Sequence, residues 1–253
     1  MILPFAGADL ARAAAGGGAL ILFSLAPIWA LRRGGRFSVR AFWAGAAGFL
    51  LFVELLEGGL HRLMLAPGSP AAGWMEGKPW LYVTYVCLAA GIFEEGGRAL
   101  LFRFWLAKEA RPALSCGLGH GAAEIWLRVA LPTLTLSGIG IWCVFRGEQV
   151  PPEILALTGR LADFSAGYTA LLLAERAAAL LLHLALSVLV YRAVRRRRPG
   201  WGVVAVLLHG LADLPPALYQ CGLISLAGSE AGFCLAAAAA ALLAWKTGRQ
   251  EEA

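Results

Sequence analysis

Residues 165–194 read SAGYTALLLAERAAALLLHLALSVLVYRAV, and four arginines, Arg195 to Arg198, follow them directly. Only three of these 30 residues are charged. Each residue of an α-helix rises about 1.5 Å and the hydrocarbon core of a bilayer is roughly 30 Å thick, so about 20 apolar residues can cross it. The arginine run is typical of a cytoplasmic boundary. This stretch therefore predicts a membrane-spanning helix.

The rest of the chain repeats this pattern. Hydrophobic residues make up 59% of the sequence and charged residues 15%, against about 25% charged residues in soluble proteins. This excludes a soluble enzyme, a secreted disulfide scaffold and a disordered chain. The composition predicts an all-α polytopic bundle, a single integral membrane domain over residues 1–253. The other predicted spans are residues 13–31, 41–60, 80–107, 113–145, 201–224 and 231–245, which makes about seven spans in all.

The stretch 113–145 is too long for one plain span. It contains Gly117, Gly119, Gly121 and Pro132, so we expect a kink or a break within it. A break would give eight helices instead of seven.

The distribution of basic residues predicts the orientation of the chain. With seven spans, 13 lysines and arginines fall in segments on one side of the membrane and five on the other. Because cytoplasmic segments are enriched in Lys and Arg, we expect the N-terminus outside and the C-terminus in the cytoplasm of a prokaryotic plasma membrane. The arginines cluster at the ends of apolar segments, and no basic stripe with interleaved aromatics points to nucleic acid.

Charged side chains inside the spans need a reason, because each costs about 2.5–3.5 kcal/mol on insertion scales. The motif FEEGGR places Glu94, Glu95 and Arg98 within one turn of a helix, so the arginine can reach either carboxylate. One glutamate can face a site while the other braces it. The motif GLGHGAAE places His120 and Glu124 four residues apart, a spacing that puts two metal ligands on one helix face.

Two further motifs follow in the predicted spans. Glu175 and Arg176 precede His183, which lies seven residues after the arginine and on the same helix face. The motif HGLAD repeats the four-residue spacing with His209 and Asp213, where the carboxylate can bind metal or orient the imidazole.

The four motifs lie at a common predicted depth. Counted from the basic residues that end each span, their His and carboxylate groups are nine to 15 residues into the membrane, which is roughly 13–23 Å. Histidines and carboxylates at one level are the ligands that a metal such as Zn²⁺ requires. The predicted metal ligands are His120, Glu124, His183, His209 and Asp213.

Taken together, FEEGGR, GLGHGAAE, ERx6HxxLSVLV and HGLAD resemble the YhfC-type intramembrane metalloproteases, which are distantly related to the CAAX prenyl-protease and bacteriocin-processing (CPBP) family and to the PrsW proteases. The resemblance covers about residues 80–213, within a motif-bearing core of about 80–224. It implies that the double glutamate supplies the catalytic carboxylate and that His209 with Asp213 forms the last motif. Either His120 or His183 matches the middle motif.

The sequence also departs from those relatives. Two residues rather than three separate Glu95 from Arg98, and Asp213 stands where the CAAX proteases usually have Asn. Prenylated substrates are therefore not implied.

The resulting hypothesis is a metal-dependent endopeptidase that cleaves a membrane-embedded or membrane-associated protein or peptide among membrane lipids. Two or three of the histidines would hold a Zn²⁺-like ion that activates water. Glu94 or Glu95 would take the proton, and Arg98 would orient that carboxylate or stabilise the oxyanion, so these three are the predicted catalytic residues. Hydrolysis by a glutamate without metal is the alternative mechanism. A non-catalytic scaffold that retains the motifs and a proton-coupled transporter are alternative functions.

Overall fold

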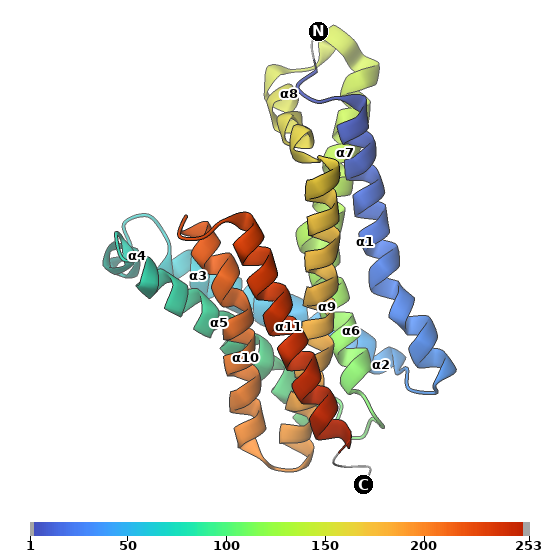
Figure 1. The fold of residues 1–253 in the computed structure, drawn as a ribbon, viewed down its shortest axis with the longest axis vertical. Coiled ribbons are helices and arrows are strands. Elements are labelled where there is room, and N and C mark those ends of the chain that lie inside the picture. Colours follow the sequence, from blue (N-terminus) through green and yellow to red (C-terminus); the bar gives the residue numbers. More distant parts are fainter. Residues whose placement is uncertain (1–2, 250–253) are drawn as a thin grey trace. The chain divides into compact units, whose positions relative to one another are not determined.

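A computed structural model describes residues 3–249, which form helices and no strand (Figure 1). This confirms the predicted all-α membrane bundle. The long helical stretches are α1 (Gly7–Arg33), α2–η1–α3 (Val39–Gly48, Phe49–Glu57, Gly58–Met64), α5–η2 (Pro79–Leu100, Leu101–Trp105), α6–η3–α7 (Ala113–Glu124, Ile125–Ala130, Leu131–Arg146), α9 (Ala166–Arg195), α10 (Pro199–Gln220) and α11 (Leu226–Arg249). Shorter elements are α4 (Pro70–Met75), η4 (Gly147–Gln149), α8 (Pro152–Thr158) and η5 (Gly159–Asp163).

Among the described residues, six of these stretches are long and apolar enough to cross a membrane. They are α1, residues 39–64, residues 113–146, α9, α10 and residues 226–247. The remaining predicted span, residues 80–107, corresponds to α5–η2, which carries Glu94, Glu95, Arg98 and Arg103. Its passage through the bilayer, and with it the count of seven and the orientation of the termini, stays a prediction.

Residues 113–146 form one continuous helix, so the described chain gains no eighth long helix here. A wider π-helical turn, η3, interrupts the α-helical pattern directly before Leu131 and Pro132. Proline has no N–H to donate, and its ring would collide with a carbonyl one turn earlier in a regular helix. The wider turn lets the helix continue past Pro132 without that collision.

The chain divides into two compact units. Unit 1 comprises Met1–Pro27 and Glu124–Ala177, and unit 2 comprises Ile28–Ala123 and Ala178–Ala253. Within unit 1, α1 packs against η3 and α7. The indole N–H of Trp126 donates to the hydroxyl of Ser24 at 2.8 Å, and a Cβ at Gly17 would lie 2.9 Å from the side chain of Leu134.

Within unit 2, glycines bring α2 and α6 into backbone contact. A Cβ added at Gly45 would overlap the carbonyl of Cys116, and one added at Gly119 would overlap the carbonyl of Phe42. In a membrane, helix association depends on close van der Waals packing, which small residues permit. These glycines therefore fix the position of α6, the helix that carries His120.

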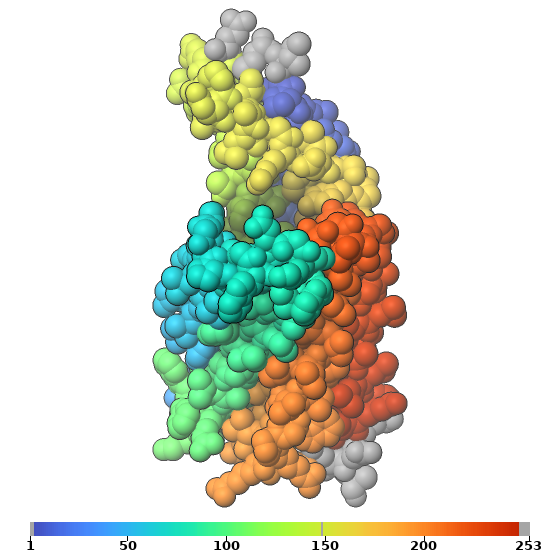
Figure 2. All heavy atoms as spheres, turned by 90° about the vertical axis from the view of Figure 1, so that its left-hand side faces the viewer, coloured from blue at the N-terminus to red at the C-terminus, as the bar shows by residue number. Residues whose placement is uncertain are grey.

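Helices α5 and α10 lie side by side in unit 2, as Figures 1 and 2 show. Glycines again set their separation. A Cβ at Gly91 would lie 2.6 Å from the carbonyl oxygen of Val206, and one at Gly210 would lie 3.1 Å from that of Cys87. Gly210 directly follows His209, so this close approach positions a motif residue of α10 beside the double glutamate of α5.

Candidate metal centre

Six charged or titratable side chains meet in the interior of unit 2. They come from four helices: Glu94, Glu95 and Arg98 from α5, His120 from α6, His183 from α9 and His209 from α10. None exposes more than 7% of its surface. Buried charges persist in proteins only where they pair or bind an ion, so the charged groups of these six residues, the Glu/His cluster, need partners within the protein.

Glu94 lies at the centre of the three imidazoles. Its Oε2 is 2.8 Å from His120 Nε2, a hydrogen-bond distance. The same oxygen is 3.9 Å from His183 Nδ1, and its Oε1 is 3.8 Å from His209 Nε2. The two longer distances exceed a hydrogen bond, and such gaps suit a bridging water or ion.

Glu95 points to a different set of partners. It forms an ion pair with Arg98 one turn along α5, and its Oε1 lies 2.7 Å from His209 Nδ1. Both carboxylate oxygens are engaged by the guanidinium. Adjacent residues on a helix point in different directions, and here Glu94 faces the histidines while Glu95 braces Arg98 and His209.

Arg98 connects the double glutamate to α9. Its Nη2 lies 3.3 Å from His183 Nδ1 and 3.9 Å from Glu94 Oε2. A guanidinium can only donate, so His183 Nδ1 is the acceptor and carries a lone pair toward the cluster. Arg98 therefore links His183 of α9 to the double glutamate of α5.

The imidazoles pack closely against one another and against an aromatic ring. The ring centroids of His120 and His183 are 4.8 Å apart, and those of His183 and His209 are 5.9 Å apart. Phe49 meets His120 edge to face at 5.3 Å. These contacts limit the rotamers of the three histidines and so hold their nitrogens toward the two carboxylates.

Glycines on α6 make room for α9 beside the cluster. A Cβ at Gly117 would lie 2.7 Å from the carbonyl oxygen of His183, and one at Gly121 would lie 3.2 Å from Cδ2 of the same imidazole. Gly117 lies three residues before His120, and Gly121 lies directly after it. Any larger residue there would push His183 away from Glu94.

The donor set fits a metal ion. Glu94, His120 and His183 each offer a ligand atom within 4.8 Å of the others, and so do Glu94, Glu95 and His209. Imidazole nitrogen and carboxylate oxygen are the ligands of catalytic Zn²⁺ sites and of related first-row metals. Glu94 belongs to both groups, so the two sets of candidate ligands adjoin at its carboxylate.

The remaining predicted ligands lie in other surroundings. Asp213 Oδ2 is 3.5 Å from His209 Nε2, but Asp213 is 30% exposed and belongs to neither group of candidate ligands among the described residues. Glu124 Oε1 accepts from Arg176 Nη1 at 2.9 Å, and Arg176 also pairs with Glu175. Glu124 and the Glu175–Arg176 pair thus form an ion-pair group within unit 1.

Sequence reasoning singled out neither Phe49 nor Ser187. Ser187 is fully buried one turn after His183, and a Cβ at Gly117 would lie 2.6 Å from its hydroxyl. Its spacing of four residues from a motif histidine is a signal that could have identified it. Phe49 lies on η1, outside every motif, so only the packing of α2–η1 against α6 reveals it.

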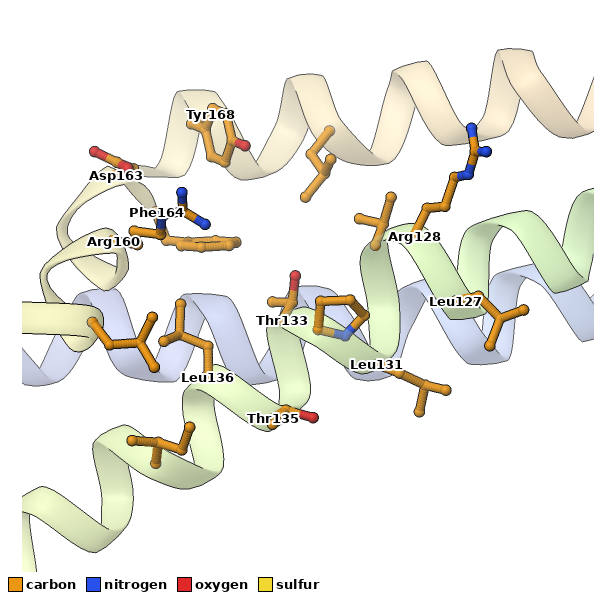
Figure 3. A pocket seen from close by; sticks show the side chains of 15 residues that line it. Leu127, Arg128, Leu131, Thr133, Thr135, Leu136, Arg160, Asp163, Phe164 and Tyr168 are labelled. Atoms are coloured by element: carbon orange, nitrogen blue, oxygen red, sulfur yellow. The ribbon is translucent and has the colours of Figure 1, made fainter. Parts of the chain in front are cut away.

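Unit 1 contains a separate cavity of about 930 Å³ (Figure 3). Arg160 and Asp163 lie near Phe164 and Tyr168 at one end of it, and Arg128 lies toward the other end. All residues that line it belong to unit 1, and none belongs to the Glu/His cluster.

The fold and the cluster define a class of protein: a multi-pass helical membrane protein with a buried group of glutamates and histidines that can hold a metal ion. The chain belongs to the YhfC intramembrane metalloprotease family, whose members match residues 19–234. It is 35% identical over 207 residues to the uncharacterized membrane protein YhfC of Bacillus subtilis (strain 168), covering 78% of this chain and 79% of that protein. No solved structure matches the chain significantly.

These comparisons confirm the family inferred from the four motifs and the multi-pass membrane location. A bacterial plasma membrane is the usual location of such a protein.

Proposed function

We propose that this protein is a metal-dependent endopeptidase that hydrolyses a peptide bond in or near the membrane. One observation carries the proposal: Glu94 faces three imidazoles from three other helices and belongs to both groups of candidate metal ligands. The family description, intramembrane metalloprotease, supports the same reading.

In this proposal the cluster holds a divalent ion, Zn²⁺ by preference, through Glu94 and the imidazoles of His120, His183 and His209. Such an ion supplies Lewis acidity, which makes water a better nucleophile near neutral pH and polarises a carbonyl. Asp213 Oδ2 lies 3.5 Å from His209 Nε2, the nitrogen that faces Glu94, and adds negative charge on the more exposed side of the site.

The two glutamates have separate roles in the proposal. The carboxylate oxygen of Glu94 that does not hold the ion takes the proton of the attacking water and delivers it to the leaving amine nitrogen. Glu95 is a positioning residue, because the Arg98 guanidinium occupies its carboxylate and its Oε1 holds His209 Nδ1 at 2.7 Å. The Glu95–His209 bond fixes which imidazole nitrogen faces Glu94.

The site constrains the substrate. All six cluster residues are buried among helices, so only an extended peptide segment can present a carbonyl to Glu94. A peptide bond inside a regular helix is protected by its own hydrogen bonds, and the substrate must unwind locally or enter from the membrane surface. Membrane-embedded or membrane-associated proteins and peptides are the substrate class that we propose.

The experiment compares newly formed protein N-termini in membranes from cells that produce wild type or Glu94→Gln. Chemical labelling of free N-termini and mass spectrometry identify cleavage sites. We expect sites in or beside apolar segments with wild type, and their loss with Glu94→Gln. The control is Glu153→Gln, which makes the same chemical change at an exposed position of α8.

Folding of each variant is checked by its thermal melt in detergent. Identical N-termini in wild-type and Glu94→Gln membranes, with both proteins folded, would overturn the protease proposal and leave the scaffold reading. Loss of proton-coupled flux in Glu94→Gln liposomes without any change in N-termini would identify a transporter instead.

A further inference from the structure

A second cavity, of about 910 Å³, lies in unit 2 away from the Glu/His cluster. Its walls come from the end of α5–η2, the end of α9 and the start of α10. Because only residues 196–198 separate α9 from α10, these helix ends lie at the same membrane edge. The cavity therefore opens where helices meet the interface between lipid and water.

The charge of this cavity is one-sided. Three of its ten lining residues are the arginines Arg103, Arg195 and Arg197, and none of those described is acidic. All three arginines are exposed, and together they form the rim of the cavity. The buried side chain of Phe102 forms an apolar inner wall with Ala99, Ala193 and Val194. A cationic rim above an apolar wall is complementary to a molecule with an anionic head and a hydrocarbon tail.

The backbone of Arg197 has a conformation that is unfavourable for a residue other than glycine. Its φ is +53°, in the left-handed region that glycine prefers at the end of a helix. The N–H of the following residue, Arg198, donates to the carbonyl of Ala193 at 3.0 Å and closes the end of α9.

Two further features hold the arginine rim in place and make the electrostatic potential of the cavity more positive. Arg195 Nη1 donates to the carbonyl of Ala107 at 3.3 Å, which joins α9 to the segment after η2. Helix α10 begins at Pro199 without a side-chain cap, and the N-terminus of a 22-residue helix carries a partial positive charge. Trp105 at the end of η2 is 60% exposed, as expected of an aromatic anchor at the interface.

We propose that this cavity binds the headgroup phosphate of an anionic phospholipid, with an acyl chain against Phe102 and Val194. The bilayer presents phospholipid phosphates at this depth, and Arg donates paired hydrogen bonds to phosphate oxygens. Basic pockets between helices at the cytoplasmic edge are where anionic headgroups bind. The site uses no residue of the Glu/His cluster, so its occupancy can be measured whatever the catalytic activity is.

The test measures lipid binding to the full-length protein in detergent by native mass spectrometry, with thermal melts in parallel. The probes are phosphatidylglycerol, phosphatidylcholine and inorganic phosphate. We expect phosphatidylglycerol to bind and to raise the melting temperature, and the other two to do neither. The variant R195Q/R197Q is expected to bind phosphatidylglycerol roughly tenfold more weakly, since each removed arginine weakens attraction to an anionic headgroup.

The matched control is R32Q/R33Q, which removes the same charge at the end of α1 outside the cavity. It is expected to bind phosphatidylglycerol like wild type. If R195Q/R197Q fails to fold, Arg103→Gln tests the same rim from η2. Equal binding of phosphatidylglycerol to wild type and a folded rim variant would overturn the proposal. So would equal binding of phosphatidylcholine, or equal stabilisation by inorganic phosphate, which would indicate a free-phosphate site.

Discussion

His120 Nε2 lies 2.8 Å from Oε2 of Glu94, although the two residues are 26 positions apart and on different helices. Both side chains are buried, so the hydrogen bond has no competition from bulk water. It joins α6 to α5 at the point where His183 and His209 also approach the carboxylate. Glu94 is thus the common member of the cluster, and the following predictions centre on it and on what holds it in place.

The first prediction concerns metal content. We expect about one metal ion per chain in wild-type protein purified without chelator. The variant H183A/H209A should lose it, because each candidate group of ligands loses an imidazole. Elemental mass spectrometry measures the metal, and a thermal melt verifies the fold of the variant. The absence of metal from both proteins would contradict the metal mechanism and leave hydrolysis by glutamate alone.

The second prediction compares the contributions of Glu94 and Glu124 to metal binding. Glu124→Gln should leave the metal content unchanged, because Glu124 pairs with Arg176 and belongs to neither candidate group of ligands. It should lower the free energy of unfolding by about 1–3 kcal/mol, since one of the two charged acceptors of Arg176 becomes a neutral amide oxygen. Glu94→Gln should lose most of the metal. Metal loss in Glu124→Gln of unchanged fold would instead restore Glu124 as a ligand.

The third prediction concerns the positioning role of Glu95. Because its Oε1 holds His209 Nδ1, Glu95→Gln should weaken metal binding roughly 10–100-fold without abolishing it. Titration with Zn²⁺ against a competing chelator measures the affinity. An unchanged affinity would show that His209 needs no such partner.

The fourth prediction concerns the buried ion pair. Arg98→Met leaves the carboxylate of Glu95 buried without its cation, and should cost about 3–5 kcal/mol of stability. The double variant E95Q/R98M should recover part of that loss, because it removes the unpaired charge. Chemical unfolding in detergent gives both values. An equal or larger loss in the double variant would argue that Arg98 stabilises the fold mainly through packing.

The fifth prediction tests the glycine contact that places α6. Gly119→Ala forces a Cβ against the carbonyl of Phe42, which is backbone and cannot rotate away. We expect a loss of about 1–3 kcal/mol and a lower metal affinity, because His120 is the next residue. Gly138→Ala on α7 is the control, since a Cβ there meets nothing within 4 Å. That change should be neutral or stabilise by up to about 1 kcal/mol. Equal melting temperatures for the two variants would contradict this account of the contact.

Composition and the lengths of the apolar stretches were enough to predict the class of fold. Long apolar stretches such as residues 165–194 must bury their backbone polar groups in helices once they lie in lipid, so composition and length are sufficient evidence. Inserting a charged or titratable side chain into lipid costs free energy. Glu94, Glu95, Arg98 and the histidines could therefore be recognised as candidate functional residues from the sequence. Their shared depth then placed them in one layer of the membrane.

Which residues of that layer contact one another depends on how the helices pack. A four-residue spacing puts His120 and Glu124 on one face of a helix but says nothing about what lies opposite each. Helix packing places Glu94 within hydrogen-bond distance of His120, and Arg176 within hydrogen-bond distance of Glu124. It also set Phe49, from a helix without any motif, against the His120 ring. Such pairings depend on how closely glycines let neighbouring helices approach, and that distance is a property of two helices together, which no single segment encodes.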